Sequence, residues 1–319
     1  MSEVILSIRG LKVYYKTRRG LVKAVDNVNL DVYKGEILGL VGESGCGKTT
    51  LGLTIMRLLP SNAIIAGGEI IFKGRDILKL SDEEMRELRG KEISMIFQDP
   101  MTSLDPLMKV GHHVMETYIY HETIDLDEAK EKARSILEKL GIERDRADDY
   151  PHQFSGGMRQ RVVIASAIAL SPSIIIADEP TTALDVVTQA QILQMLRNLR
   201  VELGSSIILI THNLGIVAQV SDRVAVMYAG KIVEVGSVHD IFNNPLHPYT
   251  IGLMRAVPKV SPEGGELISI PGTTPDLISP PSGCRFHPRC PRAKEICKKE
   301  EPKPKIIDGR IVYCHAVEG

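Results

Sequence analysis

Short hydrophobic runs alternate with amphipathic segments over the first two-thirds of the chain. Residues 36–41, 174–177 and 207–211 are almost wholly apolar, which is typical of strands buried on both faces of a sheet. Between the last two runs, residues 186–203 have the spacing of a helix, and residues 49–59 predict another. This alternation predicts a parallel β-sheet that is covered by helices on both faces.

Other segments have different patterns. In residues 25–32 apolar and polar residues mix as they do in a half-buried strand, and residues 224–228 and 232–235 predict a hairpin. The sequence SDEE at 81–84 has the form of a capping box at the start of a short helix. Residues 126–140 carry apolar residues at helical spacing among alternating charges, so we expect a helical insertion here.

The last part of the chain differs in composition. After about residue 258 it becomes rich in proline, its apolar runs shorten, and it holds four of the five cysteines. We therefore predict a domain at 1–258, with a helical subdomain at about 98–165, and a C-terminal extension at 259–319.

Composition limits the class of function. The 319 residues include 39 basic and 40 acidic ones, and this balance argues against a general nucleic-acid binder. No apolar run approaches the ~20 residues that span a bilayer. The first ten residues lack the charged-then-apolar plan of a signal peptide. We expect a cytoplasmic protein that reaches the membrane only through a partner.

Residues 42–49 read GESGCGKT and fit the pattern G-x-x-x-x-G-K-[ST] between a buried strand and a helix. Glycines let backbone N–H groups approach phosphate oxygens, and the helix N-terminus adds its positive end. We expect Lys48 to reach the β- and γ-phosphates and the Thr49 hydroxyl to bind Mg²⁺. The predicted nucleotide-binding residues of this segment are Gly42, Glu43, Ser44, Gly45, Cys46, Gly47, Lys48, Thr49 and Thr50.

The apolar run at 174–177 ends in two acids, Asp178 and Glu179. In a phosphate-binding α/β sheet, an Asp at the carboxyl end of a strand supports Mg²⁺ directly or through its waters. A second carboxylate beside it can polarise a water for attack on the γ-phosphate. Together with the phosphate loop, this pair predicts hydrolysis of a nucleoside triphosphate.

A third motif indicates the family. Residues 154–158 read FSGGM, and the whole set resembles the ATP-binding-cassette (ABC) ATPases, whose signature is usually written LSGGQ. Gln98 matches the position of the family's Q-loop, residues 182–185 match its D-loop, and His212 matches its switch histidine. The resemblance covers about residues 3–240, with every motif in the family's order.

This resemblance implies an α/β fold: a P-loop ATPase core with a parallel sheet, an antiparallel β subdomain and an inserted helical subdomain, plus a small irregular C-terminal extension. It also implies a head-to-tail pair of ATPase subunits, with ATP held between the phosphate loop of one and the signature of the other. The signature residues that would serve the partner's nucleotide are Ser155, Gly156 and Gly157.

The resemblance also implies roles for single residues. Tyr15, the aromatic residue before the first core strand, would stack on adenine, with Tyr14 as the competing choice. Glu179 would be the catalytic base, and His212 and Gln98 would complete the catalytic set. The Mg²⁺ ligands it implies are Thr49, Gln98 and Asp178.

The C-terminal part of the chain narrows the resemblance to one subfamily of ABC ATPases. Residues 247–250 (HPYT), 271–275 (PGTTP) and 283–290 (GCRFHPRC) look like the C-terminal region of oligopeptide and dipeptide importer ATPases. Phe154 and Met158 stand where the wider family usually has Leu and Gln. The signature FSGGM is the form that the importer subfamily has. No contact ascribed to the usual Gln is therefore carried over to Met158.

The resemblance thus implies the ATPase subunit of an importer of oligopeptides or dipeptides, on the cytoplasmic face of the cell membrane. Nickel or an oligosaccharide is the alternative cargo; a soluble ABC ATPase without a transport role and an exporter ATPase are the alternative classes. The implied partners are a second ABC ATPase subunit, related or identical, two transmembrane permease subunits and an extracytoplasmic substrate-binding protein, with no nucleic acid. We expect the permeases to contact the region of Gln98 and residues 99–105.

Four cysteines of the tail are spaced C-x₅-C-x₆-C-x₁₆-C. A cytosolic location disfavours disulfides, so the grouping suggests a metal site. Structural zinc prefers shorter C-x₂₋₄-C pairs, whereas wide and irregular spacing suits a [4Fe–4S] cluster. We predict an iron–sulfur cluster, with Zn²⁺ as the alternative, in a structural or regulatory role apart from phosphoryl transfer. Its predicted ligands are Cys284, Cys290, Cys297 and Cys314.

Overall fold

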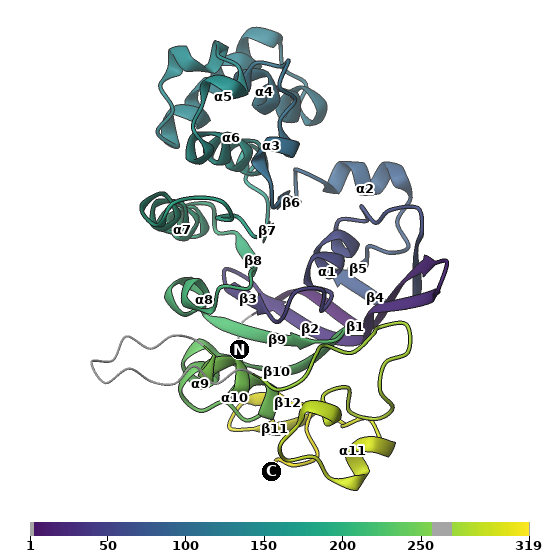
Figure 1. The fold of residues 1–319 in the computed structure, drawn as a ribbon. Coiled ribbons are helices and arrows are strands. Elements are labelled where there is room, and N and C mark those ends of the chain that lie inside the picture. Colours follow the sequence, from purple (N-terminus) through teal and green to yellow (C-terminus); the bar gives the residue numbers. More distant parts are fainter. Residues whose placement is uncertain (1–2, 257–269, 319) are drawn as a thin grey trace, which may run out of the picture. The chain divides into compact units, whose positions relative to one another are not determined.

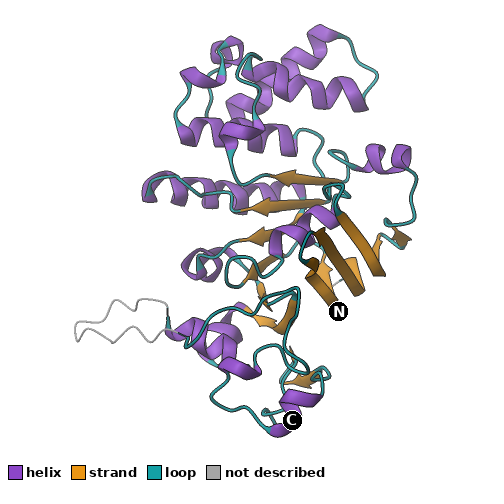
Figure 2. Ribbon diagram, turned by 45° about the vertical axis from the view of Figure 1, so that its right-hand side comes forward, coloured by secondary structure: helices purple, strands orange, loops and turns teal. Residues whose placement is uncertain are grey.

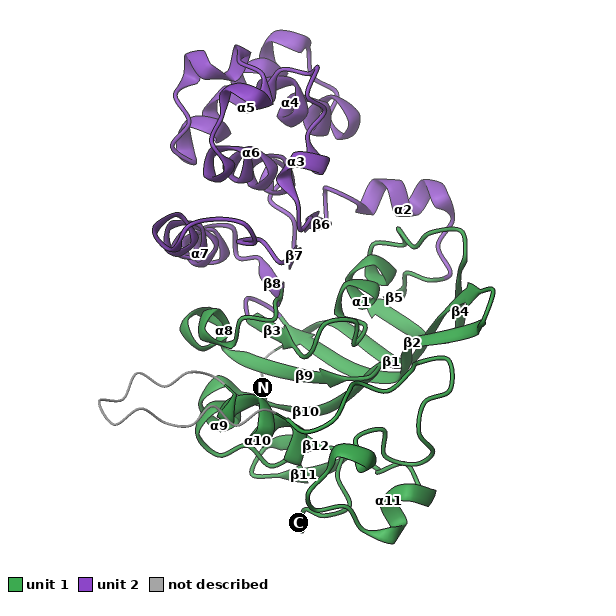
Figure 3. Ribbon diagram, in the orientation of Figure 1, with its two compact units in different colours: residues 1–33, 37–78, 210–319 green, residues 34–36, 79–209 purple. Residues whose placement is uncertain are grey.

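The computed structural model describes residues 3–256 and 270–318. The predicted domain boundary between residues 258 and 259 lies outside these described residues. The chain divides into two compact units (Figure 3). The first comprises residues 1–33, 37–78 and 210–319, and the second comprises residues 34–36 and 79–209.

The first unit contains an antiparallel sheet in the order β2-β1-β4-β5. Val25, Val28, Leu30 and Val32 of β2 are buried while their neighbours are more exposed, which confirms the predicted half-buried strand. This sheet matches the antiparallel β subdomain implied by the resemblance. Its strands are β1 (Val4–Thr17), β2 (Gly20–Tyr33), β4 (Ala63–Phe72) and β5 (Arg75–Asp76).

A second sheet region of the same unit runs in the order β11-β12-β10-β9-β3. The predicted hairpin is confirmed, because β9 and β10 pair antiparallel, and β3 pairs parallel with β9. The tail continues this sheet, because β12 pairs antiparallel with β10. The extension therefore does not form a detached module. These strands are β3 (Ile37–Val41), β9 (Arg223–Tyr228), β10 (Lys231–Ser237), β11 (Lys305–Ile307) and β12 (Arg310–Val312).

The helices of the first unit are mostly short. Helix α1 ends at Ile55, so the prediction of a helix over 49–59 was too long. Arg57 has φ 50, a left-handed conformation that a right-handed helix cannot continue through. Figure 1 shows α11, β11 and β12 in the C-terminal part of the chain. The helices are α1 (Lys48–Ile55), α8 (Leu214–Val220), α9 (Val238–Asn243), α10 (Pro248–Arg255) and α11 (Glu295–Lys299).

The second unit has strands in the order β8-β7-β6, and β6 and β7 pair parallel. All three strands are buried. The predicted apolar runs at 174–177 and 207–211 form two of them, which confirms both predictions. The strands are β6 (Ile93–Ile96), β7 (Ile174–Asp178) and β8 (Ser206–Ile210).

The segment between β6 and β7 is helical (purple in Figure 2), as the charge pattern predicted. Helix α2 begins with the predicted capping box: the Glu84 N–H donates to Ser81 Oγ at 3.1 Å, and the Ser81 N–H donates to the Glu84 carboxylate at 2.8 Å. No helix of residues 3–256 and 270–318 is long and apolar enough to cross a membrane. The helices of the second unit are α2 (Asp82–Leu88), which precedes β6, α3 (Pro100–Ser103), α4 (Val110–His121), α5 (Leu126–Lys139) and α6 (Gly156–Ile168) between β6 and β7, and α7 (Val186–Leu203) after β7.

Candidate functional site

The predicted phosphate loop connects β3 to α1 within the first unit. Two of its glycines cannot be replaced without displacing backbone. A Cβ on Gly42 would lie 2.0 Å from the Met227 carbonyl oxygen, and one on Gly47 would lie 2.1 Å from that of Ala24. Both residues also have positive φ, 154 and 108. At both positions the backbone packs closely against its neighbours in a conformation that favours glycine. The N-terminus of α1 lies at the base of this loop.

Lys48 lies within this loop and its side chain is 7% exposed. Its ammonium donates to the carbonyl oxygens of Gly42 at 2.8 Å and Glu43 at 3.1 Å. It also lies 3.7 Å from Cys46 Sγ. A buried cation that is held by two backbone carbonyls and a thiol fits an anionic ligand, because phosphate oxygens are stronger acceptors. The other residues predicted to bind the nucleotide belong to the same loop and the start of α1. Ser44 and Gly45 are exposed at the tip of the loop.

Cys46 is the one cysteine of this loop, and it is buried. Burial raises the pKa of its thiol, so the side chain stays neutral despite the nearby Lys48 ammonium. A neutral and enclosed thiol acts as a small apolar side chain. This placement supports a packing role for Cys46 beneath the loop.

The two candidate adenine-stacking residues differ in their contacts. The Tyr15 hydroxyl lies 3.0 Å from the Thr50 hydroxyl, in the first turns of α1. The Tyr14 hydroxyl donates instead to the Asp26 carboxylate at 2.9 Å, and burial together with this carboxylate raises the pKa of Tyr14 to about 12. Tyr15 is therefore the tyrosine that contacts α1, the helix that follows the predicted phosphate loop.

His212 follows β8 and belongs to the first unit. The preceding residue, Thr211, donates its N–H to the Leu40 carbonyl at 3.3 Å. This bond places the start of the His212 loop against the strand that leads into the phosphate loop. Asn213 then caps α8 by accepting from two backbone N–H groups, and the cap fixes the other side of the loop.

The second unit holds three other predicted residues at one edge of its sheet. Ile96 of β6 is level with Ala177 of β7, and the strands are parallel. Gln98 comes two residues after β6, and Asp178 is the last residue of β7. Both residues therefore lie at the carboxyl ends of neighbouring parallel strands. Asp178 is 2% exposed, at the end of β7.

Glu179, the next residue, has φ 49, which is uncommon for a residue with a side chain. Its carboxylate accepts a hydrogen bond from the Thr182 hydroxyl at 2.9 Å. Sparsely populated backbone conformations concentrate at active sites, where the surrounding structure holds a side chain in one direction. The backbone conformation of Glu179 and the hydrogen bond from Thr182 together fix the position of the carboxylate.

The signature lies at the start of α6, in the second unit. Ser155 is the N-cap and accepts from the Met158 N–H at 3.4 Å. A Cβ on Gly157 would lie 2.4 Å from Thr188 Cγ2 of α7, whereas one on Gly156 would meet only Leu184 Cδ2 at 3.4 Å. Gly157 is therefore required by packing, and Gly156 presents an open backbone at a helix N-terminus.

Arg146 contacts both residues at which this signature departs from the usual LSGGQ. Its guanidinium stacks 4.3 Å from the centre of the Phe154 ring, and its Nη1 lies 3.6 Å from Met158 Sδ. It also donates to the Gln153 carbonyl at 3.2 Å. Sequence reasoning missed Arg146, because nothing in its local pattern marks it.

The four tail cysteines all belong to the first unit. Cys297 and Cys314 are buried, and Cys284 and Cys290 are half-buried. The Cys284 N–H donates to the Cys297 carbonyl at 2.8 Å, and the Lys294 N–H lies 3.4 Å from Cys297 Sγ. Burial, and then the other three thiols, raise the pKa of Cys284 to about 11.

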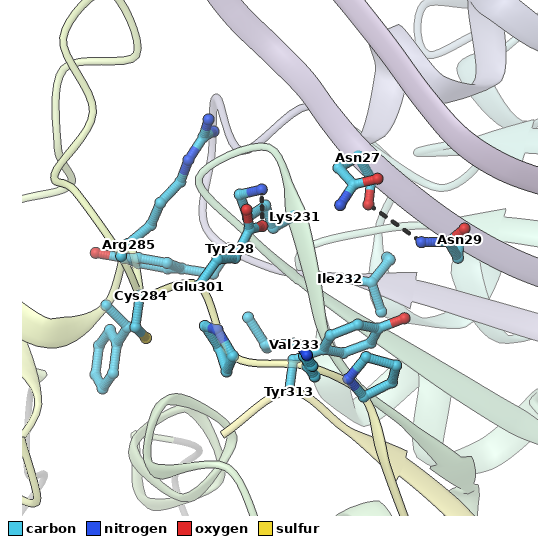
Figure 4. Close-up of a pocket in the computed structure, with 15 residues that line it drawn as sticks. Asn27, Asn29, Tyr228, Lys231, Ile232, Val233, Cys284, Arg285, Glu301 and Tyr313 are labelled. Carbon is cyan, nitrogen blue, oxygen red and sulfur yellow. Dashed lines mark hydrogen bonds and ion pairs between the residues drawn. The ribbon is translucent and has the colours of Figure 1, made fainter. Parts of the chain in front are cut away.

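These thiols are therefore neighbours, but in this structure they are not arranged as ligands of one metal ion. Among residues 3–256 and 270–318, no three His, Cys, Asp or Glu side chains are arranged to hold a metal ion. A cavity of about 210 Å³ adjoins Cys284, which lies with Arg285 in one wall, and Tyr313 lies across from them (Figure 4). Lys231 and Glu301 form an ion pair in its lining.

The three residues predicted to bind Mg²⁺ all carry oxygen donors, which this ion prefers. Thr49 has a hydroxyl and belongs to the first unit. Gln98 and Asp178 have an amide oxygen and a carboxylate and belong to the second unit. The donor types within each unit therefore fit the ion.

Comparisons with known proteins match two parts of the chain to protein families. Residues 25–182 match the family described as ABC transporter, and residues 233–297 match the one described as oligopeptide/dipeptide transporter, C-terminal region. The chain is 50% identical over 316 residues to the dipeptide transport ATP-binding protein DppD of Bacillus subtilis, covering 98% of this chain and 94% of that protein. It is 48% identical over 315 residues to the oligopeptide transport ATP-binding protein OppD of Salmonella typhimurium, with the same two shares.

A solved structure is similar over most of the chain. It is the dimeric post-hydrolysis state of an ATP-binding cassette bound to ADP and Pi, with a TM-score of 0.66 and 29% sequence identity. The match covers 73% of this chain and 98% of that one.

Proposed function

Since the chain belongs to the ATP-binding subunits of oligopeptide/dipeptide ABC transporters and is an ABC-type ATP hydrolase, we propose that it drives uptake of oligopeptides or dipeptides. The observation that carries this cargo class is the match of residues 233–297 to the C-terminal region of such transporters. The alternative cargoes, nickel and oligosaccharides, would use the same ATPase.

We assign the chemistry to the residues that the sequence motifs predict. Lys48 and the backbone N–H groups at the start of α1 bind the β- and γ-phosphates. Thr49, Gln98 and Asp178 would hold Mg²⁺, which would neutralise charge on these phosphates. Tyr15 stacks on adenine, in line with its contact with Thr50.

Glu179 is the proposed general base. It accepts a proton from the water whose oxygen attacks the γ-phosphorus, while the bond from that phosphorus to the β–γ bridging oxygen breaks and ADP leaves. The bond from Thr182 and the fixed backbone hold the carboxylate in position for this transfer. His212 and Gln98 are assigned to orienting the γ-phosphate and the water.

The partner of this chain is a second ABC ATPase subunit in a head-to-tail pair, with Ser155, Gly156 and Gly157 facing the partner's nucleotide. The dimeric cassette to which this chain is similar supports the pairing. Two permease subunits and an external substrate-binding protein complete the proposed importer, at the cytoplasmic face of the membrane. The proposed domains are 1–258 and 259–319, with a helical subdomain at about 98–165.

Mixing two inactive variants tests the pairing. Gly156→Asp places a negative charge against the partner's phosphate, yet its Cβ fits, and an acid in the first helical turn favours the helix. Lys48→Ala removes phosphate binding on the other subunit. Each variant alone should be inactive, and the mixture should regain ATPase activity through one intact composite site. No recovery at any ratio, with both variants folded and dimeric, would refute the arrangement.

The [4Fe–4S] cluster at Cys284, Cys290, Cys297 and Cys314 remains part of the proposal, with Zn²⁺ as the alternative. Its support is that the four cysteines lie in one part of the extension, where a backbone hydrogen bond joins Cys284 to Cys297. The N–H of Lys294 at Cys297 Sγ is the kind of hydrogen bond that stabilises a thiolate ligand. Binding would require the thiols to move into a common ligand set.

Transport assays test the cargo. The chain should be purified with the membrane subunits that accompany it and reconstituted into vesicles with the external binding protein. A panel of di- and oligopeptides should stimulate ATP hydrolysis and accumulate in vesicles, whereas nickel and oligosaccharides should not. Accumulation of a sugar or nickel without any peptide would contradict the proposed cargo and leave the ATPase assignment intact.

A further inference from the structure

The C-terminal extension contacts the phosphate loop through Arg289. Arg289 and Glu43, the second residue of the loop, form a two-bond ion pair with Nη1–Oε2 at 2.8 Å and Nη2–Oε1 at 3.0 Å. The arginine side chain is 7% exposed and the glutamate side chain 25%. Paired bonds of this kind fix the orientation of both groups as well as their distance.

The guanidinium of Arg289 is itself held in place. Its Nε donates to the Pro271 carbonyl at 2.8 Å, and its Nη atoms lie 3.4 Å from the Tyr228 hydroxyl and the Ile270 carbonyl. The hydrogen bonds with Glu43 raise the pKa of Arg289, so the side chain is always charged. Because little of its freedom remains, Arg289 presents a preformed site for one carboxylate.

Glu43 passes this restraint to Lys48. The Glu43 N–H donates to the Tyr249 hydroxyl at 2.9 Å, so the residue is fixed through its backbone as well as its side chain. Its carbonyl oxygen then accepts from Lys48 Nζ at 3.1 Å. A continuous chain of contacts therefore runs from Arg289 through Glu43 to the phosphate-binding lysine.

An aromatic cluster anchors the segment that carries Arg289. The Phe286 ring packs edge-on against Tyr228 and Tyr249, with ring centres 5.1 and 5.4 Å apart. Arg285 adds a second anchor, because it donates to the Ala229 carbonyl and pairs with Asp26. The short segment from Arg285 to Arg289 is thus bound to the cassette at three places, and the last is the phosphate loop.

We propose that Arg289 is a positioning residue for ATP hydrolysis, which holds Glu43 and thereby keeps the phosphate loop and Lys48 in the conformation that receives the nucleotide. The proposal rests on the assignment of residues 42–49 as the phosphate loop, and it does not depend on what the four cysteines bind. The extension becomes a part of the ATP site even though it contributes no group to the reacting atoms.

The variant Arg289→Gln tests this directly. Loss of a charge-assisted pair should weaken ATP and ADP binding about tenfold or more. AMP, which lacks the β- and γ-phosphates that the loop holds, should bind as before. The KM for ATP should rise while kcat at saturating ATP stays near the wild-type value, because bound phosphate orders the loop. Arg289→Lys, which retains the charge and one bond, should recover part of the affinity.

Two comparisons separate positioning from a general loss of stability. Glu43→Gln should reproduce the loss, and the double variant should lose far less than the product of the two single effects, because both remove one interaction. Arg292→Gln changes an exposed arginine three residues further on and should leave ATP affinity unchanged.

Wild-type ATP affinity in folded Arg289→Gln would overturn the proposal. Equal losses for AMP and ATP, or independent effects of the two single variants, would overturn it as well. Failure of the phosphate-loop assignment itself would show separately, as unchanged ATP binding in Lys48→Ala. If Arg289→Gln does not fold, Glu43→Gln and Arg289→Lys give the same measurements.

Discussion

The hydroxyl of Tyr15 lies 3.0 Å from that of Thr50, two residues into α1 from its first residue Lys48. The neighbouring tyrosine has its hydroxyl on Asp26, which is also bound by Arg285. The two hydroxyls therefore reach different partners, which gives the two tyrosines different surroundings. Tyr15 contacts α1, and Tyr14 joins the ion pairs that hold the extension.

This difference predicts separate effects for the two tyrosines. Tyr15→Ala should weaken ATP binding by about 1–3 kcal/mol, the range for loss of an aromatic side chain stacked on a base. Tyr15→Phe keeps the ring and should bind ATP nearly as well as the wild type. Titration with a fluorescent ATP analogue measures both. Tyr14→Phe is the matched control, and a larger loss there than in Tyr15→Ala would reverse the assignment.

Replacement of the proposed base should separate binding from turnover. Glu179→Gln keeps the size and the hydrogen bond with Thr182 but cannot accept the proton, so ATP hydrolysis should fall by about 10²–10⁴-fold. Binding of Mg-ATP should persist and favour the closed dimer, which size-exclusion chromatography detects. Glu202→Gln, at an exposed acid of the same unit, should hydrolyse ATP normally. Activity of Glu179→Gln within a few-fold of wild type would exclude this residue as the base.

Anaerobic purification checks the proposed cluster. The protein should be brown, absorb broadly near ~400 nm and contain about four irons per chain. Cys297→Ser should lose the colour and the iron while ATP still binds at Lys48. Cys46→Ser is the control, because this cysteine belongs to the phosphate loop, and its colour should remain. A colourless wild-type preparation with one zinc and no iron would establish the alternative.

A buried histidine should make stability depend on pH. Burial lowers the pKa of His247 to about 3, and its Nδ1 accepts from the Tyr249 N–H at 3.0 Å. The unfolded chain binds a proton near the ordinary pKa of ~6.5, so stability is full above that value and falls as the pH decreases toward the folded pKa. The free energy of unfolding should fall by about 2 kcal/mol between pH 7 and 5 from this group.

Urea titrations at the two pH values measure this loss. His247→Asn retains an acceptor at the N-cap of α10 but does not titrate, so its unfolding free energy should change less between pH 7 and 5. His239→Asn, at an exposed histidine, should keep the wild-type difference. The same pH difference in His247→Asn and wild type would assign the effect to other groups.

The amino-acid sequence by itself determined the elements whose cause is local. The run at 186–203 forms α7 over those same residues, and the capping box at Ser81 starts α2. The phosphate loop, the signature and the strand that ends in Asp178 follow from residue types at fixed spacing. Periodicity, glycine conformation and side-chain caps act over a few residues, so they can be identified without the fold.

Only the tertiary structure decided which distant residues meet. Arg289 and Glu43 are 246 residues apart, and Arg285 and Asp26 are 259 apart, yet each pair is in direct contact. The choice of Tyr15 over Tyr14 and the pairing of β12 with β10 are of the same kind. Sequence separation suggested that the cysteine-bearing tail acts apart from the ATP loop. In the folded chain the aromatic packing of Phe286 brings an arginine of that tail onto the loop, because burial of rings and ion pairs depends on the assembled core and not on local pattern.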